Sequence, residues 1–305
     1  MDPNSIRRLD RTITPPSVAQ VYRQATMIAL VGNALLLAAK AVAAYLSGSS
    51  ALYADAANSA SDVAYSLLML IGLWLSLRPP DKSHPHGHQR IESLVSVGIG
   101  LFMALAGYGA LAKGLDSWRA GAPLTLSSWL LLVPAGTILV KGAMYVRVRA
   151  LAQQVGSPAI AASARDHLSD VLTSGVVFVG VFGSRLALPQ ADPVAGILVS
   201  IWIFYQAASV VREAVGHLIG AAASPELEAA AIAAIRRVPE VLAIEQLIIE
   251  HVGPELRADI HVQVDGELPL RRVHRISHAI REAVEALDGV DHAFVHVEPD
   301  VRDDA

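Results

Sequence analysis

Long apolar runs alternate with short polar breaks over the first two thirds of the chain. Each run is about 20 residues or longer, and an α-helix of that length crosses a hydrocarbon core of about 30 Å. The breaks contain Gly, Pro or Ser, which favour turns. The pattern predicts six membrane-spanning helices, near residues 23–47, 51–77, 92–117, 126–148, 158–185 and 192–217. We therefore expect a polytopic α-helical membrane protein.

The pattern changes near residue 224, where the apolar runs shorten to strand length and Glu, Arg and His recur. A turn at Gly253 and Pro254 is expected between two strands. Helical and alternating spacings predict a helix, two strands, a second helix and a last strand, at residues 225–237, 241–251, 257–264, 269–286 and 293–297. This order is typical of a small α+β domain with helices over one face of its sheet.

The expected domains are a polar N-terminal segment at 1–20, a transmembrane domain at 21–219 and a soluble domain at 220–305. The N-terminal segment lacks the apolar core of a cleaved signal, so the first span is expected to direct insertion. Basic residues concentrate in the N-terminal segment and after the second and fourth spans, which by the positive-inside rule places both termini in the cytoplasm, at the inner membrane. These residues are Arg7, Arg8, Arg11, Arg78, Lys82, Arg90, Arg147 and Arg149.

The amino-acid composition excludes some classes of function and some types of metal ligand. Hydrophobic residues make up 53% of the 305 residues and charged residues 17%, against about 45–50% and about 25% in soluble domains. The net charge of -4 provides no broad basic surface, so nucleic acid is not an expected partner. The chain has no cysteine, so any metal ligand must be histidine or an oxygen donor.

Acidic residues inside two predicted spans are the strongest functional signal, because an ionised group there costs about 2.5–3.5 kcal/mol. Asp55, Asn58 and Asp62 follow one helical stripe of the second span, and Asp166 and Asp170 are one turn apart in the fifth. Such carboxylates would repel each other, and a bound divalent cation is the simplest compensation. Convergence of the two spans predicts an oxygen site of Asn58, Asp62, Asp166 and Asp170.

Other interpretations of these polar residues stay open. The carboxylates could be protonated, or hydrogen-bonded to Ser and Thr, and only line a polar seam. Asp55 could guide ions or cap its helix. His167 lies about 100° from the Asp166 stripe, which favours a supporting or interhelical contact, although a His167/Asp170 pair is geometrically possible. Lys40 of the first span could snorkel or pair with an acid from another helix.

Histidines outside the spans suggest two further metal sites. In the loop after the second span, Asp81, His84 and His88 are the expected ligands of Zn²⁺ or a similar ion, with His86 between them. In the soluble domain, His261 and His296 fall within two strands, and His274 and His278 are one turn apart on the helix between them, so a shared cluster is plausible. His296 and Glu298 alternate onto one strand face, which favours the cluster. The alternative is that both groups are solvated surface side chains.

Together these segments resemble the cation diffusion facilitator family over nearly the whole chain. The similarity lies in SALYADAANSASD at 50–62, HPHGHQRIE at 84–92 and DHLSDVLTS at 166–174, with weaker matches in DIHV at 259–262 and VHVEP at 295–299. The resemblance implies six transmembrane helices, a homodimer, a ferredoxin- or metallochaperone-like cytoplasmic domain, and export of divalent metal in exchange for protons. It assigns the transport and loop sites to the residues named above, and it implies cytoplasmic-domain metal positions at His261, His274, His296 and Glu298.

Two departures from the family pattern bear on metal choice. Zinc-transporting members commonly place a histidine in the transport site, whereas here every position is Asn or Asp. Oxygen donors suit harder ions, so the expected substrate is Mn²⁺, with Fe²⁺ next and Zn²⁺, Cd²⁺ or Co²⁺ as alternatives. Ile244 and Glu245 stand where family patterns have a metal-binding histidine in the first soluble strand. No cofactor is expected, and the competing classes are an intramembrane aspartyl protease and a non-transporting metal sensor.

Overall fold

Six long helices form the N-terminal two thirds of the computed structural model, which describes residues 16–76, 83–84, 88–121, 127–155, 158–186 and 188–300. A short 3₁₀ helix, η1 (Ser128–Leu131), precedes the fourth long helix. The long helices are α1 (Pro16–Ser47), α2 (Ser50–Ser76), α3 (Arg90–Ala120), α4 (Leu132–Val155), α5 (Pro158–Arg185) and α6 (Ala191–Ile219). The six predicted spans are therefore confirmed as six helices.

Five of these helices, α1, α3, α4, α5 and α6, are long and apolar enough to cross a membrane within the described residues. The remaining one, α2, carries Asp55, Asn58 and Asp62 along its first half. Large apolar side chains point away from the protein, such as Leu105 at 72% exposed and Leu139 at 75%. Such exposure suits helices whose outer faces contact lipid.

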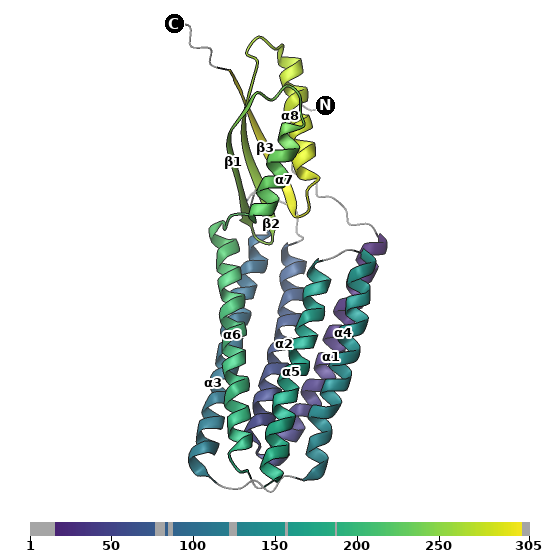
Figure 1. Cartoon of the computed structure of the whole chain (residues 1–305), viewed down its shortest axis with the longest axis vertical. Helices are drawn as coiled ribbons and strands as arrows, with labels where there is room; N and C mark the ends of the chain where they lie inside the picture. Colours follow the sequence, from purple (N-terminus) through teal and green to yellow (C-terminus); the bar gives the residue numbers. More distant parts are fainter. Residues whose placement is uncertain are drawn as a thin grey trace. The chain divides into compact units, whose positions relative to one another are not determined.

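Small residues allow the helices to approach closely, as is common in membrane bundles. Gly107 and Gly114 of α3 face α6: a Cβ at Gly107 would lie 3.2 Å from Cγ2 of Ile203, and one at Gly114 would lie 2.9 Å from Cγ1 of Ile197. Figure 1 shows α3 beside α6. α4 contacts both α1 and α5. The buried apolar core of the helical unit joins residues of α2, α3, α5 and α6, including Leu52, Ile99 and Val181.

The helix, strand, strand, helix, strand order predicted for the C-terminal domain is confirmed. Ser224 caps the first helix by accepting a hydrogen bond from the Leu227 N–H, and Gly253 has a φ of 73° in the turn between the first two strands. Both features suit the local sequence. The elements are α7 (Pro225–Arg236), β1 (Ala243–Val252), β2 (Glu255–Val264), α8 (Leu270–Glu285) and β3 (Val290–Pro299).

The three strands form one mixed sheet in the order β1-β2-β3. β1 is antiparallel to β2, whereas β3 is parallel to β2 and follows it through α8. Alternate residues of β2, including Ile260 and Val262, are buried with Ile276 and Ile280 of α8. The opposite face of the sheet exposes Ile248 and other side chains. α8 therefore covers one face only, as expected for this type of domain.

Contacts within the chain divide it into a helical unit, residues 12–71 and 95–211, and a second unit, residues 1–11, 72–94 and 212–305. Gln89 belongs to the second unit because its side chain donates hydrogen bonds to Glu255 and to Asp291, the latter over 3.3 Å. A Cβ added to Gly253 would lie 2.7 Å from the Gln89 carbonyl oxygen. The segment after the loop histidines is thus held against the turn between β1 and β2.

Candidate metal-transport site

Two carboxylates from different helices meet at one ammonium group inside the helical unit. Nζ of Lys141, on α4, lies 3.2 Å from Oδ2 of Asp62 on α2 and donates a short hydrogen bond to Oδ2 of Asp170 on α5. Lys141 is 1% exposed and Asp170 is 5% exposed. Because charged groups are rarely buried without partners, this arrangement compensates charge. The three groups together carry a formal charge of about -1 when all are ionised.

Asn58 completes one side of this cluster. Its Nδ2 donates a hydrogen bond of 3.0 Å to Oδ1 of Asp170, and its side chain is almost fully buried. Its Oδ1 is also buried and has no hydrogen-bond partner among the described residues. A buried polar atom without a partner normally costs about 1–3 kcal/mol. The amide oxygen is therefore a donor that a bound cation could use beside Asp62 and Asp170.

The predicted set of four residues is only partly brought together. Asp166 is exposed, whereas the next residue, His167, is 2% exposed. Both ring nitrogens of His167 are buried and have no hydrogen-bond partner in the described part of the chain. Buried positions of α5 recur at Ile160, His167 and Ser174, a seven-residue spacing that defines its inner face. The inner face thus carries His167 and Asp170, and Asp166 lies to one side of it.

A second buried lysine, Lys40 of α1, forms an ion pair, which decides between the pairing and snorkelling expected for it. Nζ of Lys40 lies 2.8 Å from Oδ1 of Asp55 and donates a hydrogen bond of 2.9 Å to Oγ of Ser59. Ser174 also donates to Oδ1 of Asp55 over 3.3 Å. Lys40 is thus paired rather than snorkelling. Oδ1 of Asp55 is engaged in this buried pair, whereas its Oδ2 is buried and has no hydrogen-bond partner among the described residues.

Asp192, at the start of α6, holds the beginning of α2 instead. Its Oδ2 accepts hydrogen bonds of 2.7 Å from both the N–H and the Oγ–H of Ser50, and its Oδ1 accepts a short bond from Ser49. The residue is fully buried. A carboxylate that accepts N–H groups at a helix start satisfies donors that have no partner within the helix. The sequence analysis missed this role.

Three of the residues predicted to bind metal in the C-terminal domain, His261, His296 and Glu298, lie on two neighbouring strands. His261 of β2 is opposite His296 of β3, and the ring centroids are 4.9 Å apart. Oε1 of Glu298 lies 3.2 Å from Nδ1 of His261 and 3.4 Å from Nε2 of His296. Hydrogen bonds with Glu245 and with His261 hold the pKa of Glu298 below its usual range. Two imidazoles and one carboxylate within 4.8 Å of one another form a donor set suited to zinc-like ions.

His274 does not join this group, contrary to the predicted cluster. It lies on α8, where its ring centroid is 4.5 Å from that of His278. α8 packs against the face of β2 that carries Ile260, whereas His261 points from the opposite face because successive strand residues alternate. The sheet therefore separates His274 from His261. The sequence pattern does not show which face of the sheet α8 covers, so this separation could not be predicted.

The structure describes two of the three residues predicted for the loop site, His84 and His88. The rings of His84 and His88 have centroids 4.6 Å apart, a spacing at which both could contribute nitrogen ligands to one ion. Asp81 and His86 lie outside the described residues. The third predicted ligand of this site, Asp81, thus remains a prediction.

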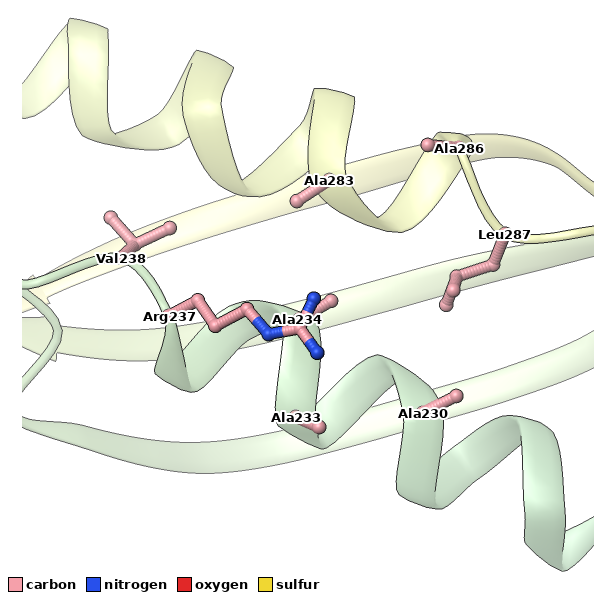
Figure 2. Close-up of a pocket in the computed structure, with 8 residues that line it drawn as sticks. All are labelled: Ala230, Ala233, Ala234, Arg237, Val238, Ala283, Ala286 and Leu287. Atoms are coloured by element: carbon pink, nitrogen blue, oxygen red, sulfur yellow. The ribbon is translucent and has the colours of Figure 1, made fainter.

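A separate pocket of about 470 Å³ lies between α7 and α8. Figure 2 shows its lining side chains, which are Ala230, Ala233, Ala234, Arg237, Val238, Ala283, Ala286 and Leu287. This lining contains neither a carboxylate nor an imidazole, so the pocket does not provide a metal site.

Family comparison accounts for both parts of the molecule. The cation efflux transmembrane domain matches residues 26–219. The chain belongs to the cation efflux, or cation diffusion facilitator, family. The cation efflux protein cytoplasmic domain matches residues 223–300. The resemblance inferred from sequence motifs is confirmed, and the chain is a divalent metal cation efflux protein rather than an enzyme.

Several relatives span most of this cation efflux protein. The uncharacterized transporter MJ0449 of Methanocaldococcus jannaschii is 29% identical over 89% of this chain and 96% of its own length. The magnetosome protein MamM of Paramagnetospirillum magneticum is 30% identical over 84% and 81%. The manganese efflux system protein MneS of Bacillus subtilis is 26% identical over 90% and 94%. A solved variant of MamM-CTD is 24% identical, covers 25% of this chain and 98% of that one, and gives a TM-score of 0.24.

Lys141 was not predicted to be functional and His167 was placed outside the expected ligand set, whereas both side chains are buried in the helical unit of this cation efflux protein. Lys141 stands alone among apolar residues in the middle of α4, and an intramembrane charge is by itself a functional signal with an expected partner. Helical spacing placed His167 about 100° from Asp166, so it was expected to make a supporting or interhelical contact.

Proposed function

We propose that this protein exports Mn²⁺ from the cytoplasm in exchange for protons, with Fe²⁺ as the next candidate. The transport site would use oxygen atoms of Asn58, Asp62, Asp166 and Asp170. The observation that carries the proposal is the buried convergence of Asn58, Asp62 and Asp170, in which an unpartnered amide oxygen stands beside two carboxylates. Carboxylate and amide oxygens suit Mn²⁺, and because most oxygen sites bind Zn²⁺ more tightly, selection of Mn²⁺ would come from geometry and coordination number.

Two relatives support manganese as the substrate. MneS and MneP of Bacillus subtilis, both named manganese efflux system proteins, are 26% and 27% identical to this chain over about nine tenths of its length. Their substrate is carried over to this protein as part of the proposal.

His167 favours a second candidate of the same class, an exporter of Zn²⁺ or of the similar ions Cd²⁺ and Co²⁺. Its imidazole is buried on the same face of α5 as Asp170, and its nitrogens have no hydrogen-bond partner in the described ranges. An imidazole that replaced Asp166 in the ligand set would give the mixed nitrogen and oxygen site that suits zinc.

Exchange with protons follows from the chemistry of the ligands. A carboxylate can hold a proton or a metal ion on the same oxygen atoms, but not both, so metal binding depends on pH. Protons that enter the site from outside the cell would replace the ion on Asp62 and Asp170 and favour its release. The site would then return empty or protonated toward the cytoplasm.

The arrangement in the membrane is part of the same proposal. The positive-inside rule supports cytoplasmic termini at the inner membrane, with the transmembrane domain at 21–219 and the cytoplasmic domain at 220–305. The match to the cytoplasmic domain and the exposed apolar side chains Ile248 and Phe294 on the uncovered sheet face support a homodimer. A second metal would bind at His261, His296 and Glu298, and a third at Asp81, His84 and His88.

Proteoliposomes with a pH gradient test the transport proposal. We expect uptake of Mn²⁺ by the wild type, weaker uptake of Zn²⁺ and Cd²⁺, and loss of uptake in Asp62→Ala and Asp170→Ala. Asp166→Ala separates the two candidates, because it abolishes transport if Asp166 is a ligand and spares it if His167 takes its place. Wild-type flux of Zn²⁺ without Mn²⁺ flux would replace manganese by zinc. Metal binding without flux of any ion would make the protein a sensor.

A further inference from the structure

Lys141 occupies the position at which a transported cation would bind. Its Nζ contacts Oδ2 of Asp62 and Oδ2 of Asp170, the oxygen atoms that face each other across the site. Metal ions bind oxygen ligands at about 2.0–2.6 Å. The ammonium group contacts the same two oxygens that such an ion would use, so the two cations compete for these oxygens.

The two buried lysines, Lys40 and Lys141, differ in the number of acids that they contact. Lys40 has its own acid, Asp55, and forms a one-to-one pair with it. Lys141 instead contacts two acids, and both belong to the proposed transport site. Within the described residues, it is the only basic side chain paired with either of them. Its role is therefore tied to the site rather than to packing between helices.

We propose that Lys141 is a tethered competitor of the transported ion. Its ammonium group fills the empty site between Asp62 and Asp170, and a divalent ion binds only after displacing it. The flexible stem of a lysine side chain permits such a displacement. This inference rests on the proposed function, and it adds the residue that limits the affinity of the site.

Competition of this kind serves a transport cycle in two ways. It compensates the two carboxylates while no ion is bound, so the empty site does not leave buried charges without partners. It also lowers the net affinity for the ion, which favours release on the far side. An opposite charge at this range changes the cation affinity of a carboxylate by about tenfold or more.

Equilibrium binding of Mn²⁺ to the purified full chain in detergent, at pH 8 where protons compete least, tests the inference. We expect Lys141→Met to lower the Kd by about tenfold or more. Lys141→Arg keeps the charge and should bind no more tightly than the wild type. The matched control is the double variant Lys40→Met with Asp55→Leu, which removes a buried lysine together with its own acid and should leave the Kd unchanged.

A Kd for folded Lys141→Met that equals or exceeds the wild-type value would overturn the inference. If Lys141→Met does not fold, acylation of lysines in the wild type gives the answer, read by mass spectrometry. Saturating Mn²⁺ should increase the reactivity of Lys141 and leave that of Lys40 unchanged. Unchanged reactivity of Lys141 would equally overturn the inference.

The same experiment distinguishes the inference from the proposed function. Asp170→Ala should abolish high-affinity Mn²⁺ binding if the transport site is correctly assigned. Intact binding in Asp170→Ala would remove the site and the inference together. Loss of binding in Asp170→Ala without tighter binding in Lys141→Met would leave the transport site standing and remove only the role of Lys141.

Discussion

Nζ of Lys40 and Oδ1 of Asp55 lie 2.8 Å apart, and both side chains are about 1% exposed. The pair joins α1 to α2, and Ser59 and Ser174 contribute further hydrogen bonds to its two members. Its two formal charges cancel within the pair. The helical unit thus contains two buried charged groups: the neutral pair of Lys40 and Asp55, and the group of Asp62, Lys141 and Asp170, which carries net charge when all three are ionised. Mutations in the two groups should therefore have different effects.

Removing one member of the neutral pair should destabilise the protein strongly. Asp55→Ala leaves the Lys40 ammonium buried without its acid, and we expect a loss of about 3–5 kcal/mol. The double change Lys40→Met with Asp55→Leu removes both charges and should recover most of that loss. Thermal unfolding in detergent measures the three variants. Equal stability of Asp55→Ala and the wild type would show that the pair is not needed for the fold.

Close approach of α3 to α6 predicts a size limit at Gly114. A Cβ there would lie 2.9 Å from Cγ1 of Ile197, so Gly114→Leu forces the helices apart and should cost about 1–3 kcal/mol. Gly98, on the same helix, has no atom within 4 Å of its added Cβ. Gly98→Leu is therefore the matched control, and its unfolding temperature should stay close to that of the wild type. A similar loss in both variants would contradict the packing argument.

His251 should make the second unit less stable in mild acid. Burial, and the charge of His217 whose ring centroid is 4.2 Å away, lower the pKa of His251 from its ordinary value of 6.5. The folded state therefore binds fewer protons than the unfolded state, so stability is retained above pH 6.5 and is lost as the pH falls below it. His251→Gln should flatten the fall in unfolding temperature between about pH 7.5 and 5. An unchanged slope would exclude His251 as the responsible group.

The strand cluster should bind a zinc-like ion independently of transport. In an Asp170→Ala background, where the transport site is disabled, we expect His261→Ala and Glu298→Ala to weaken Zn²⁺ binding by about tenfold or more. His274→Ala is the matched control, because His274 lies on the helix-covered side of the sheet, and it should leave the affinity unchanged. Isothermal titration of the full chain in detergent measures these affinities. Weaker binding in His274→Ala alone would relocate the site to α8.

The helices were predictable because a bilayer imposes a minimum apolar length on every span, and the breaks between runs mark their ends. Strand ends were less predictable. The last strand was expected at 293–297 but runs from Val290 to Pro299, because pairing with β2 extends it beyond its apolar pattern. Leu256 already pairs with Val290, and Val264 still pairs with Pro299. Hydrogen bonding between strands, rather than side-chain alternation, determines these bounds.

The convergence of acids at the proposed transport site was predictable to the extent that helical spacing determines it. Asn58 and Asp62 share one stripe of α2, and Asp170 meets them from α5. Spacing within one helix does not reveal how far that helix is rotated about its axis. For this reason the inner position of His167, and the outer position of Asp166, could not be derived from the acids alone. Lys141 carried a sequence signal, an isolated charge inside an apolar span, but spacing within α4 could not identify its partners on α2 and α5.

The bond between Asp192 and Ser50 also limits how the helices can move. It fastens the first turn of α6 to the first turn of α2, and Gly196 allows α6 to pass within van der Waals range of the Ser50 backbone. Two helices clamped at one end can separate only by swinging about that end. Asp62 lies three turns along α2 from the clamp, so a small tilt there becomes a larger displacement at the ligand. A tilt of α2 about Asp192 would therefore move Asp62, a residue of the proposed transport site, farther than it moves Ser50.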